Sequence, residues 1–162
     1  MYKKNYYLPL ILSVILLCSS AVFGFQLTDG LRQVKTLQFG WKFMKGAPLN
    51  AQAPNFDDRN WEEVSVPHDW AISGPFILDG EGNTGKLPWK GEGWYRNYLD
   101  IPAEYARKRL YLIFDGVMAF PTIYLNGEMV GWWDYGYNSF FIDITEAANP
   151  GGENILAVHA NT

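Results

Sequence analysis

The sequence predicts an all-β fold, an antiparallel β-sandwich, on three observations. Seven Trp, ten Tyr and ten Phe are spread over short apolar runs that sixteen Gly and nine Pro separate; this mixture is typical of strands and turns. Residues 110–115 place Leu110, Leu112 and Phe114 on one face of a strand, as a strand with one buried face does. Asn126-Gly127 joins the β-rich runs 122–125 and 128–132. This dipeptide is a strong hairpin signal, because a type I′ turn needs positive φ at both central residues.

The first 24 residues have the pattern of a secretory signal peptide. Lys3 and Lys4 give a positive start, and residues 8–17 form an apolar stretch too short to span a bilayer. Small residues at 19–24 supply a cleavage site, so residues 25–162 are expected to be secreted or periplasmic, with no membrane span. Cys18 is the only cysteine. Lipid attachment there is the minor alternative, because Leu17 is bulkier than the small residue that lipoprotein processing usually requires.

The remaining elements follow in chain order. Residues 36–43 alternate with Leu37, Phe39, Trp41 and Phe43 on one side of a strand. Further strands are predicted over 63–66, 93–101, 110–115, 122–125, 128–132, 135–142 and 154–160. Single helical turns are predicted over 56–61, where carboxylates suit the helix dipole, and over 146–149, with Thr145 as the cap. We expect the consecutive strands between 110 and 142 to form one sheet, with the rest of the chain covering its apolar face.

A long glycine-rich loop separates two of these strands. Residues 73–93 contain six glycines and two prolines. A loop of this length inside a compact domain is usually functional or mobile. It contains Asn83 between glycines, and Trp89.

Charge and composition exclude several classes of function. The formal net charge is −4, and the tight basic run 107–109 leads directly into a strand, so nucleic acid is not an expected partner. With two His and one Cys, we expect neither a metal site nor a cofactor. Some carboxylates lie in or near loops, and we interpret them by default as charges exposed to solvent. They are Asp79, Glu81, Glu92 and Asp134. No pair of them is placed for catalysis by sequence.

Two interpretations stay open for each candidate binding residue. His68 followed by Asp69 is either an oriented imidazole or, as we favour, part of a structural turn next to Trp70. His159 lies in a strand pattern and is expected to be packed or at a rim. Aromatic rings beside loops can form a platform for the apolar faces of sugars, or can belong to the core. The tryptophans in question are Trp89, Trp132 and Trp133.

An ordered series of motifs resembles the N-terminal sugar-binding domain of glycoside hydrolase family 2, the β-galactosidase, β-glucuronidase and β-mannosidase family. The series spans residues 39–161 and reads Phe56-Asp57-Asp58 with Trp61, Val66-Pro67-His68-Asp69-Trp70, Gly93-Trp94-Tyr95-Arg96, Phe114-Asp115-Gly116-Val117, Leu125-Asn126-Gly127, Tyr135-Gly136-Tyr137 with Ser139-Phe140, Asp143-Ile144-Thr145 and Gly152-Glu153-Asn154. The Pro-His-Asp-Trp form and the glycine-rich loop are most similar to the β-galactosidase branch.

The resemblance implies a jelly-roll-like, galactose-binding-domain-like sandwich. In the family such a domain precedes an immunoglobulin-like domain and a (β/α)8 barrel, which carries two catalytic Glu residues for retaining hydrolysis. This chain lacks those domains, so no catalytic residue is carried over and the chain is expected to be inactive alone. Its carbohydrate substrate would bind through the parent's barrel, and a homo-oligomer of the parent is left open. The end of the chain within a strand pattern suggests a piece of a longer polypeptide.

The resemblance also suggests substrate-binding residues. An Asn in the loop before Gly93 reaches the active site in well-known members, and Asn83 has a similar setting, although extra residues separate it from Gly93. The family often has Val-Asp-Asn where this chain has His159-Ala160-Asn161. The expected substrate-binding set is Asn83, Trp89, Asp69, His68 and Asn161. Alternatives from other classes are a free-standing carbohydrate-binding module and a structural β-sandwich of a surface assembly; the sequence downstream of Thr162 would distinguish them.

Overall fold

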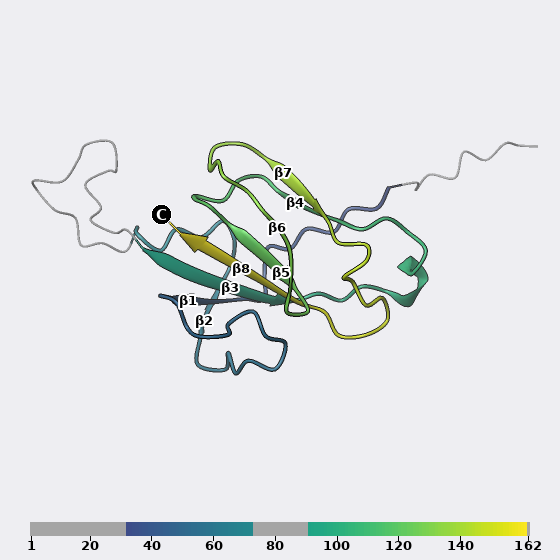
Figure 1. Ribbon diagram of the computed structural model, residues 1–162, viewed down its shortest axis with the longest axis horizontal. Coiled ribbons are helices and arrows are strands. Elements are labelled where there is room, and N and C mark those ends of the chain that lie inside the picture. Colours follow the sequence, from purple (N-terminus) through teal and green to yellow (C-terminus); the bar gives the residue numbers. More distant parts are fainter. Residues whose placement is uncertain (1–31, 73–90, 162) are drawn as a thin grey trace, which may run out of the picture. The chain divides into compact units, whose positions relative to one another are not determined.

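Two antiparallel sheets make up the described part of the protein. The computed structural model describes residues 32–72 and 91–161, and the fold is that of the compact unit that begins at Thr36. Six strands form one sheet in the order β2-β1-β3-β8-β5-β6 (Figure 1). They are β1 (Trp41–Lys45), β2 (Glu62–Val64), β3 (Glu92–Tyr98), β5 (Thr122–Leu125), β6 (Glu128–Trp132) and β8 (Ile155–Asn161). The second sheet pairs β4 (Tyr111–Phe114) with β7 (Phe140–Asp143), and a 3-10 turn, η3 (Ala103–Tyr105), follows β3. The predicted all-β antiparallel fold is confirmed.

The main core lies between the two sheets. In β4, Leu112 is buried while Tyr111 and Ile113 are exposed, so the predicted alternation is confirmed. The buried members of this core are Trp41, Leu99, Ile101, Leu112, Ile123, Leu125, Phe140, Ile144, Leu156 and Val158. Burying a large apolar side chain stabilises a fold by about 1.5–3 kcal/mol relative to leaving it exposed. The core is therefore what holds the two sheets together.

The other face of the six-stranded sheet, called the outer face below, carries a second apolar cluster. Trp94 of β3 and Ala157 of β8 are buried there, together with Ala51 and Trp61 from the segment between β1 and β2. Neighbouring residues of a strand point to opposite faces. For this reason Leu156 and Val158 face the main core while Ala157 faces the connecting segment.

A buried ion pair attaches that segment to the outer face. Nε of Arg96, in β3, donates to Oδ2 of Asp58 at 2.8 Å, and the two side chains are 0% and 8% exposed. Nη1 of Arg96 also donates to the carbonyl oxygens of Ala51 at 2.5 Å and Ala53 at 3.1 Å. Because buried charges need paired and hydrogen-bonded partners, this geometry makes Arg96 the anchor of residues 51–58.

The predicted hairpin is confirmed. β5 and β6 pair antiparallel with Leu125 opposite Glu128. Asn126 and Gly127 have φ values of 54° and 89°, as a turn with two left-handed central residues requires. The Asn126 side chain also donates from Nδ2 to Oδ1 of the buried Asn154 at 3.1 Å. This hydrogen bond holds the turn against Asn154, the residue directly before β8.

The expectation that consecutive strands between 110 and 142 form one sheet is wrong. β4 pairs with β7, whereas β5 pairs with β6 on one side and with the distant β8 on the other. The predicted strand over 135–142 is also shorter than expected, since β7 begins at Phe140. Alternation in a sequence identifies which side chains face the core, but it carries no information on which strand lies alongside.

Two local expectations near the start of the domain are corrected. The first strand begins at Trp41 and not at residue 36, and Phe39 is 72% exposed rather than buried. Gly40 has a φ of 80°, a left-handed value that interrupts the extended chain and rotates Phe39 away from the core. Residues 56–61 contain a turn at 59–60 and no helical turn, and Oδ1 of Asp57 accepts a hydrogen bond from the backbone N–H of Arg59.

The second predicted helical turn is a turn without a Thr cap. The hydroxyl of Thr145 donates to Oδ1 of Asp143 at 2.6 Å, and the Thr145 N–H donates to the same oxygen at 2.9 Å. Asp143 therefore accepts the first backbone N–H of the turn, while the Oγ1 atom of Thr145 accepts the backbone N–H of Leu110 from outside it at 3.0 Å. The backbone N–H of Asn149 donates to Oδ1 of Asn154 at 2.7 Å, which ends the turn before Pro150.

Candidate functional site

The Pro-His-Asp-Trp motif is built into an aromatic cluster beside the main core. Nδ1 of His68 lies 3.0 Å from the hydroxyl of Tyr95, and the imidazole packs edge-on against Phe43 with ring centroids 4.8 Å apart. Trp70 stacks on the same Phe43 ring at 5.5 Å. Burial, followed by the nearby charge of Asp69, raises the pKa of Tyr95 well above its usual range. These contacts hold the end of the 66–72 segment against β1 and β3.

Asp69 itself closes a local turn. Its Oδ1 accepts a hydrogen bond from the backbone N–H of Ala71 at 2.9 Å, and its carbonyl oxygen accepts one from Ile72 at 3.4 Å. This is the geometry of an Asx turn. The arrangement agrees with the structural-turn interpretation of the motif, and the substrate-binding role of His68 and Asp69 stays a prediction.

A polar group of side chains lies where β3 begins and β8 ends. Nε2 of His159 is 3.2 Å from Oε2 of Glu92, and the His159 ring stacks on Trp94 with centroids 4.7 Å apart. The register places Asn161 directly opposite Glu92, and the N–H of Asn161 donates to the carbonyl oxygen of Ala119 at 3.0 Å. Asn161, Glu92 and His159 are therefore brought together at one end of the six-stranded sheet.

This group was only partly accessible to sequence reasoning. The expected position of His159 at a rim fits its half-buried side chain, but its partner Glu92 stands 67 residues away. Strand alternation could have placed His159 on the face opposite Val158. Only the β3–β8 register shows that Glu92 lies next to it.

The positions of the other candidates differ. Asn83 and Trp89 lie outside the described residues. His68 packs with Phe43 and Tyr95 on the core-facing side of the sheet, whereas alternation along β8 places His159 and Asn161 on its outer face. The structure thus places His68 and Asn161 on opposite faces of the sheet.

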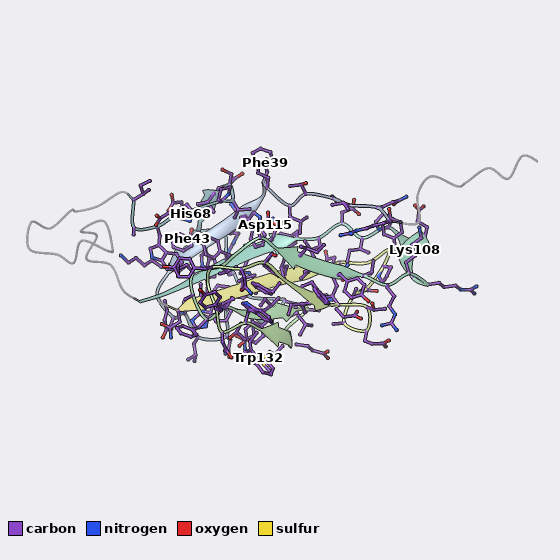
Figure 2. All side chains as sticks on the ribbon, turned by 90° about the horizontal axis from the view of Figure 1, so that it is seen from above. Phe39, Phe43, His68, Lys108, Asp115 and Trp132 are labelled. Carbon is purple, nitrogen blue, oxygen red and sulfur yellow. The ribbon has the colours of Figure 1, made fainter. Side chains whose placement is uncertain are left out.

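Aromatic side chains gather at the end of β6 and in the residues that follow it, at the same end of the sheet as Asn161. Trp132 is 60% exposed, and in Figure 2 it projects from the side opposite His68. Trp133 is half-buried, stacks on Phe140 with centroids 5.3 Å apart, and donates from Nε1 to Oδ1 of Asn138 at 2.8 Å. A shallow hollow of about 290 Å³ is lined by Trp132, Trp133, Asp134 and Tyr135. Trp133 thus belongs to the core while Trp132 is available as a platform.

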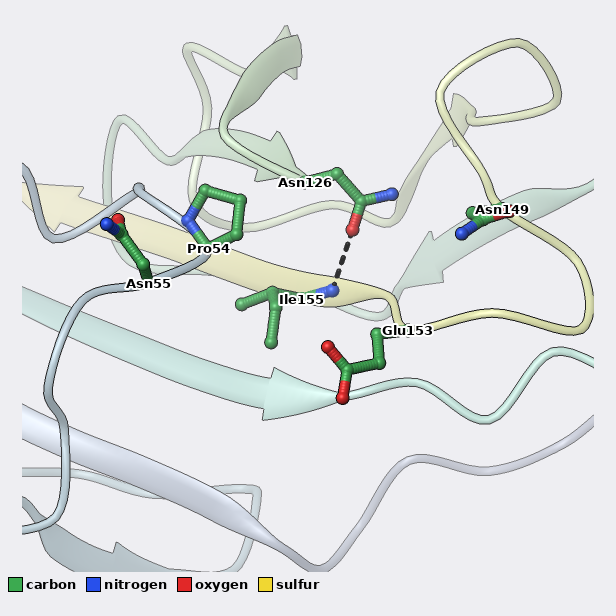
Figure 3. A pocket seen from close by; sticks show the side chains of 6 residues that line it. All are labelled: Pro54, Asn55, Asn126, Asn149, Glu153 and Ile155. Atoms are coloured by element: carbon green, nitrogen blue, oxygen red, sulfur yellow. Dashed lines mark hydrogen bonds between the residues drawn. The ribbon is translucent and has the colours of Figure 1, made fainter.

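A second hollow, of about 500 Å³, lies at the opposite end of the sheet around the Asn126-Gly127 turn (Figure 3). Its lining residues are Pro54, Asn55, Asn126, Asn149, Glu153 and Ile155. The Asn126 amide is fully engaged, because Nδ2 donates to the carbonyl oxygen of Ala147 and Oδ1 accepts the Ile155 N–H at 2.9 Å. This amide acts as a structural tie between the hairpin and β8.

Residues 32–72 and 91–161 contain neither a clustered set of metal ligands nor a membrane-spanning helix. No group of three or more His, Cys, Asp or Glu side chains in these ranges is placed to hold a metal ion. In the same ranges no helix has the length and hydrophobicity needed to cross a bilayer.

Comparison with known proteins identifies the domain. The family model described as "Glycosyl hydrolase 2 galactose-binding domain-like" matches residues 68–162. A β-galactosidase of Bacteroides ovatus is 37% identical over 123 residues, which are 75% of this chain and 14% of that protein. A β-glucuronidase of Formosa agariphila is 32% identical over 141 residues, covering 83% of this chain and 14% of the relative.

Solved structures give the same result. A β-glycosidase from Bacteroides vulgatus superposes with a TM-score of 0.72 and 31% identity, over 80% of this chain and 17% of that one. A Bacteroides uniformis β-glucuronidase superposes with a TM-score of 0.71 and 32% identity, over 80% of this chain and 14% of that one. The chain spans about one seventh of the length of these two curated relatives. Since the family model covers more than half of the chain, the chain belongs to glycoside hydrolase family 2, as its galactose-binding-like domain.

Proposed function

We propose that this domain completes the substrate pocket of a retaining family 2 hydrolase that acts on β-galactosides or related β-glycosides. The catalytic carboxylates would come from a barrel that follows the domain, and the protein would act outside the cytoplasm after removal of residues 1–24. The observation that carries the proposal is the group of Asn161, Glu92 and His159 at one end of the six-stranded sheet. In the proposed assembly this end faces the barrel.

The chemistry of this group suits sugar hydroxyls. The exposed Asn161 amide both donates and accepts hydrogen bonds, and the Glu92 carboxylate accepts them. His159 holds the Glu92 carboxylate at 3.2 Å, which fixes the direction in which that acceptor points. Asn83 and Trp89, from the segment that leads into β3, would contribute further contacts to the same pocket.

Charge favours a neutral sugar over a uronic acid. Glu92 and Asp134 are acidic side chains at the same end of the sheet as Asn161, and the chain has a net charge of −4. A sugar carboxylate would be repelled by both groups, since like charges at short range disfavour binding. Among the relatives' activities, β-galactoside hydrolysis therefore fits this chain better than β-glucuronide hydrolysis.

Replacing Asn161 in the complete polypeptide tests the proposal. Asn161→Ala should lower kcat/KM for 4-nitrophenyl β-galactoside about tenfold, or ~1.4 kcal/mol of transition-state stabilisation, with the melting temperature unchanged. The matched control is Asn60→Ala, which removes an exposed amide from the turn before β2 and should change neither quantity. A complete polypeptide that hydrolyses no aryl β-galactoside, β-glucuronide or β-mannoside would refute the proposal and favour a free-standing carbohydrate-binding module.

A further inference from the structure

A row of side chains crosses the outer face of the six-stranded sheet at the end where Asn161 lies. The registers place Trp132 of β6 opposite Thr122 of β5, Thr122 opposite His159 of β8, and His159 opposite Trp94 of β3. Directly opposed residues of neighbouring antiparallel strands project from the same face. These four side chains therefore form one continuous strip, with the Glu92–His159 pair near one end and Trp132 at the other.

Trp132 is the member of the strip that the fold does not explain. Its ring is 60% exposed, whereas its neighbour Trp133 is held by ring stacking on Phe140. The backbone on either side is fixed, because the N–H of Trp133 donates to the carbonyl oxygen of Pro121 at 3.0 Å and Trp132 pairs with Thr122. A large apolar ring is thus presented to solvent on a rigid strand end.

The hollow beside Trp132 combines aromatic rings with a carboxylate. Tyr135 is 58% exposed and lines the hollow with Trp132 and with the exposed Asp134. The loop that contains Tyr135 packs closely against Met118, since a Cβ on Gly136 would lie only 2.7 Å from Sδ of Met118. Flat rings next to a hydrogen-bond acceptor suit a pyranose, whose faces are apolar and whose edge carries hydroxyls. An apolar protein surface fits less well, because it would bury the Asp134 charge without a partner.

The spacing of the strip matches an extended saccharide. Neighbouring strands lie about 4.8 Å apart, so β6 and β8, with β5 between them, are separated by roughly 10 Å. This is the length of a disaccharide. A sugar at Asn161 and Glu92 would therefore place the next ring of a β-linked chain over Thr122 and against Trp132.

We propose that Trp132 and Tyr135, with Asp134, bind the sugar that follows the scissile bond in a neutral β-linked oligosaccharide. This inference rests on the proposed function, because it takes the terminal sugar to lie at Asn161. The hollow is then a determinant of specificity for oligosaccharides over substrates without a second ring.

Two substrates separate this role from a general effect on activity. Lactose carries a second sugar, whereas β-galactosyl fluoride has only a fluoride leaving group. In the complete polypeptide, Trp132→Ala should lower kcat/KM for lactose about ten times more than kcat/KM for β-galactosyl fluoride, and Tyr135→Ala should act in the same direction. Trp132→Tyr keeps an aromatic ring and should restore much of the lactose activity.

The control is Phe141→Ala. Phe141 is 69% exposed, but it lies on β7 in the other sheet, so its loss should leave the ratio of the two kcat/KM values unchanged. If Trp132→Ala proves unstable by thermal melting, Trp132→Tyr and Tyr135→Ala carry the test. An unchanged ratio in those variants, with Asn161→Ala still impaired on both substrates, would overturn this inference alone. A wild-type polypeptide that hydrolyses neither substrate would overturn this inference, and one that also hydrolyses no aryl β-galactoside, β-glucuronide or β-mannoside would overturn the proposed function with it.

Discussion

Asp58→Ala tests whether the buried ion pair stabilises the domain. The substitution removes the carboxylate that faces Nε of Arg96 at 2.8 Å and leaves a fully buried guanidinium. The hydrogen bonds from Nη1 to the carbonyl oxygens of Ala51 and Ala53 stay, but they are dipoles and do not neutralise the charge. We therefore expect the free energy of unfolding to fall steeply.

The expected loss is about 3–5 kcal/mol, the usual cost of removing one partner from a buried pair. Because the free energy of unfolding of a small domain is only about 5–15 kcal/mol, this loss is a large share of the total stability. The corresponding fall in melting temperature is on the order of 10–20 °C for a domain of this size.

Urea unfolding followed by tryptophan fluorescence measures the effect, since Trp61 and Trp94 are buried in the cluster that Arg96 and Asp58 border. The matched control is Arg59→Ala, one residue along, which removes a similar 2.6 Å pair with Asp57 whose side chains are 85% and 55% exposed. Exposed pairs contribute little, so the control should unfold at nearly the wild-type urea concentration. Equal unfolding midpoints for Asp58→Ala and Arg59→Ala would refute the assignment of Arg96 as an anchor.

Three further predictions follow from the fold. Gly127→Val should lower the free energy of unfolding by about 1–3 kcal/mol, because φ is 89° and a Cβ would lie 3.0 Å from Pro54; equal melting temperatures would contradict this. Hydrogen bonds from Thr145, aided by Arg109, hold the pKa of Asp143 below its ordinary value of 3.8. The carboxylate therefore stabilises the fold above that value and loses its effect as the pH falls through the lower folded-state pKa. The urea unfolding midpoints of Asp143→Asn and wild type should differ at neutral pH and converge in acid. A difference that stays constant with pH would count against the assignment. The 162-residue chain alone should hydrolyse no aryl β-glycoside, and turnover that persists after rigorous removal of host enzymes would show otherwise.

Local chemistry made several elements predictable. The Asn126-Gly127 turn and the alternation around Leu112 depend only on neighbouring residues, so the sequence contains all the information that they need. The start of β1 depended on Gly40, whose φ is 80°; glycine adopts positive and negative φ about equally well, so its presence alone does not show where a strand begins. The partner of each strand depended on contacts across the whole chain, and for this reason the assignment of the strands to the two sheets was not predicted.

The candidate site was likewise predictable only in its single residues and not in their arrangement. Asn161 became a candidate because it stands where the family often has the Asn of Val-Asp-Asn, and its substrate-binding role stays a prediction. The partnership of Glu92 with His159, and the alignment of Trp132 with them, exist only through strand register. Single positions can be read from a sequence, whereas the surface that they form together requires the sheet.

The central place of β8 has a consequence for the order of folding. β8 is the last of the described strands, yet it lies between β3 and β5 and supplies the ladders that join β2-β1-β3 to β5-β6. During synthesis on the ribosome, the two halves of this sheet have no shared backbone hydrogen bonds until residues 155–161 emerge. Domains dominated by such distant pairings fold slowly, because long loops have to close, at a cost in chain entropy, before the stabilising contacts form. The nascent chain would therefore expose two incomplete half-sheets, each with an open edge that only the final strand closes.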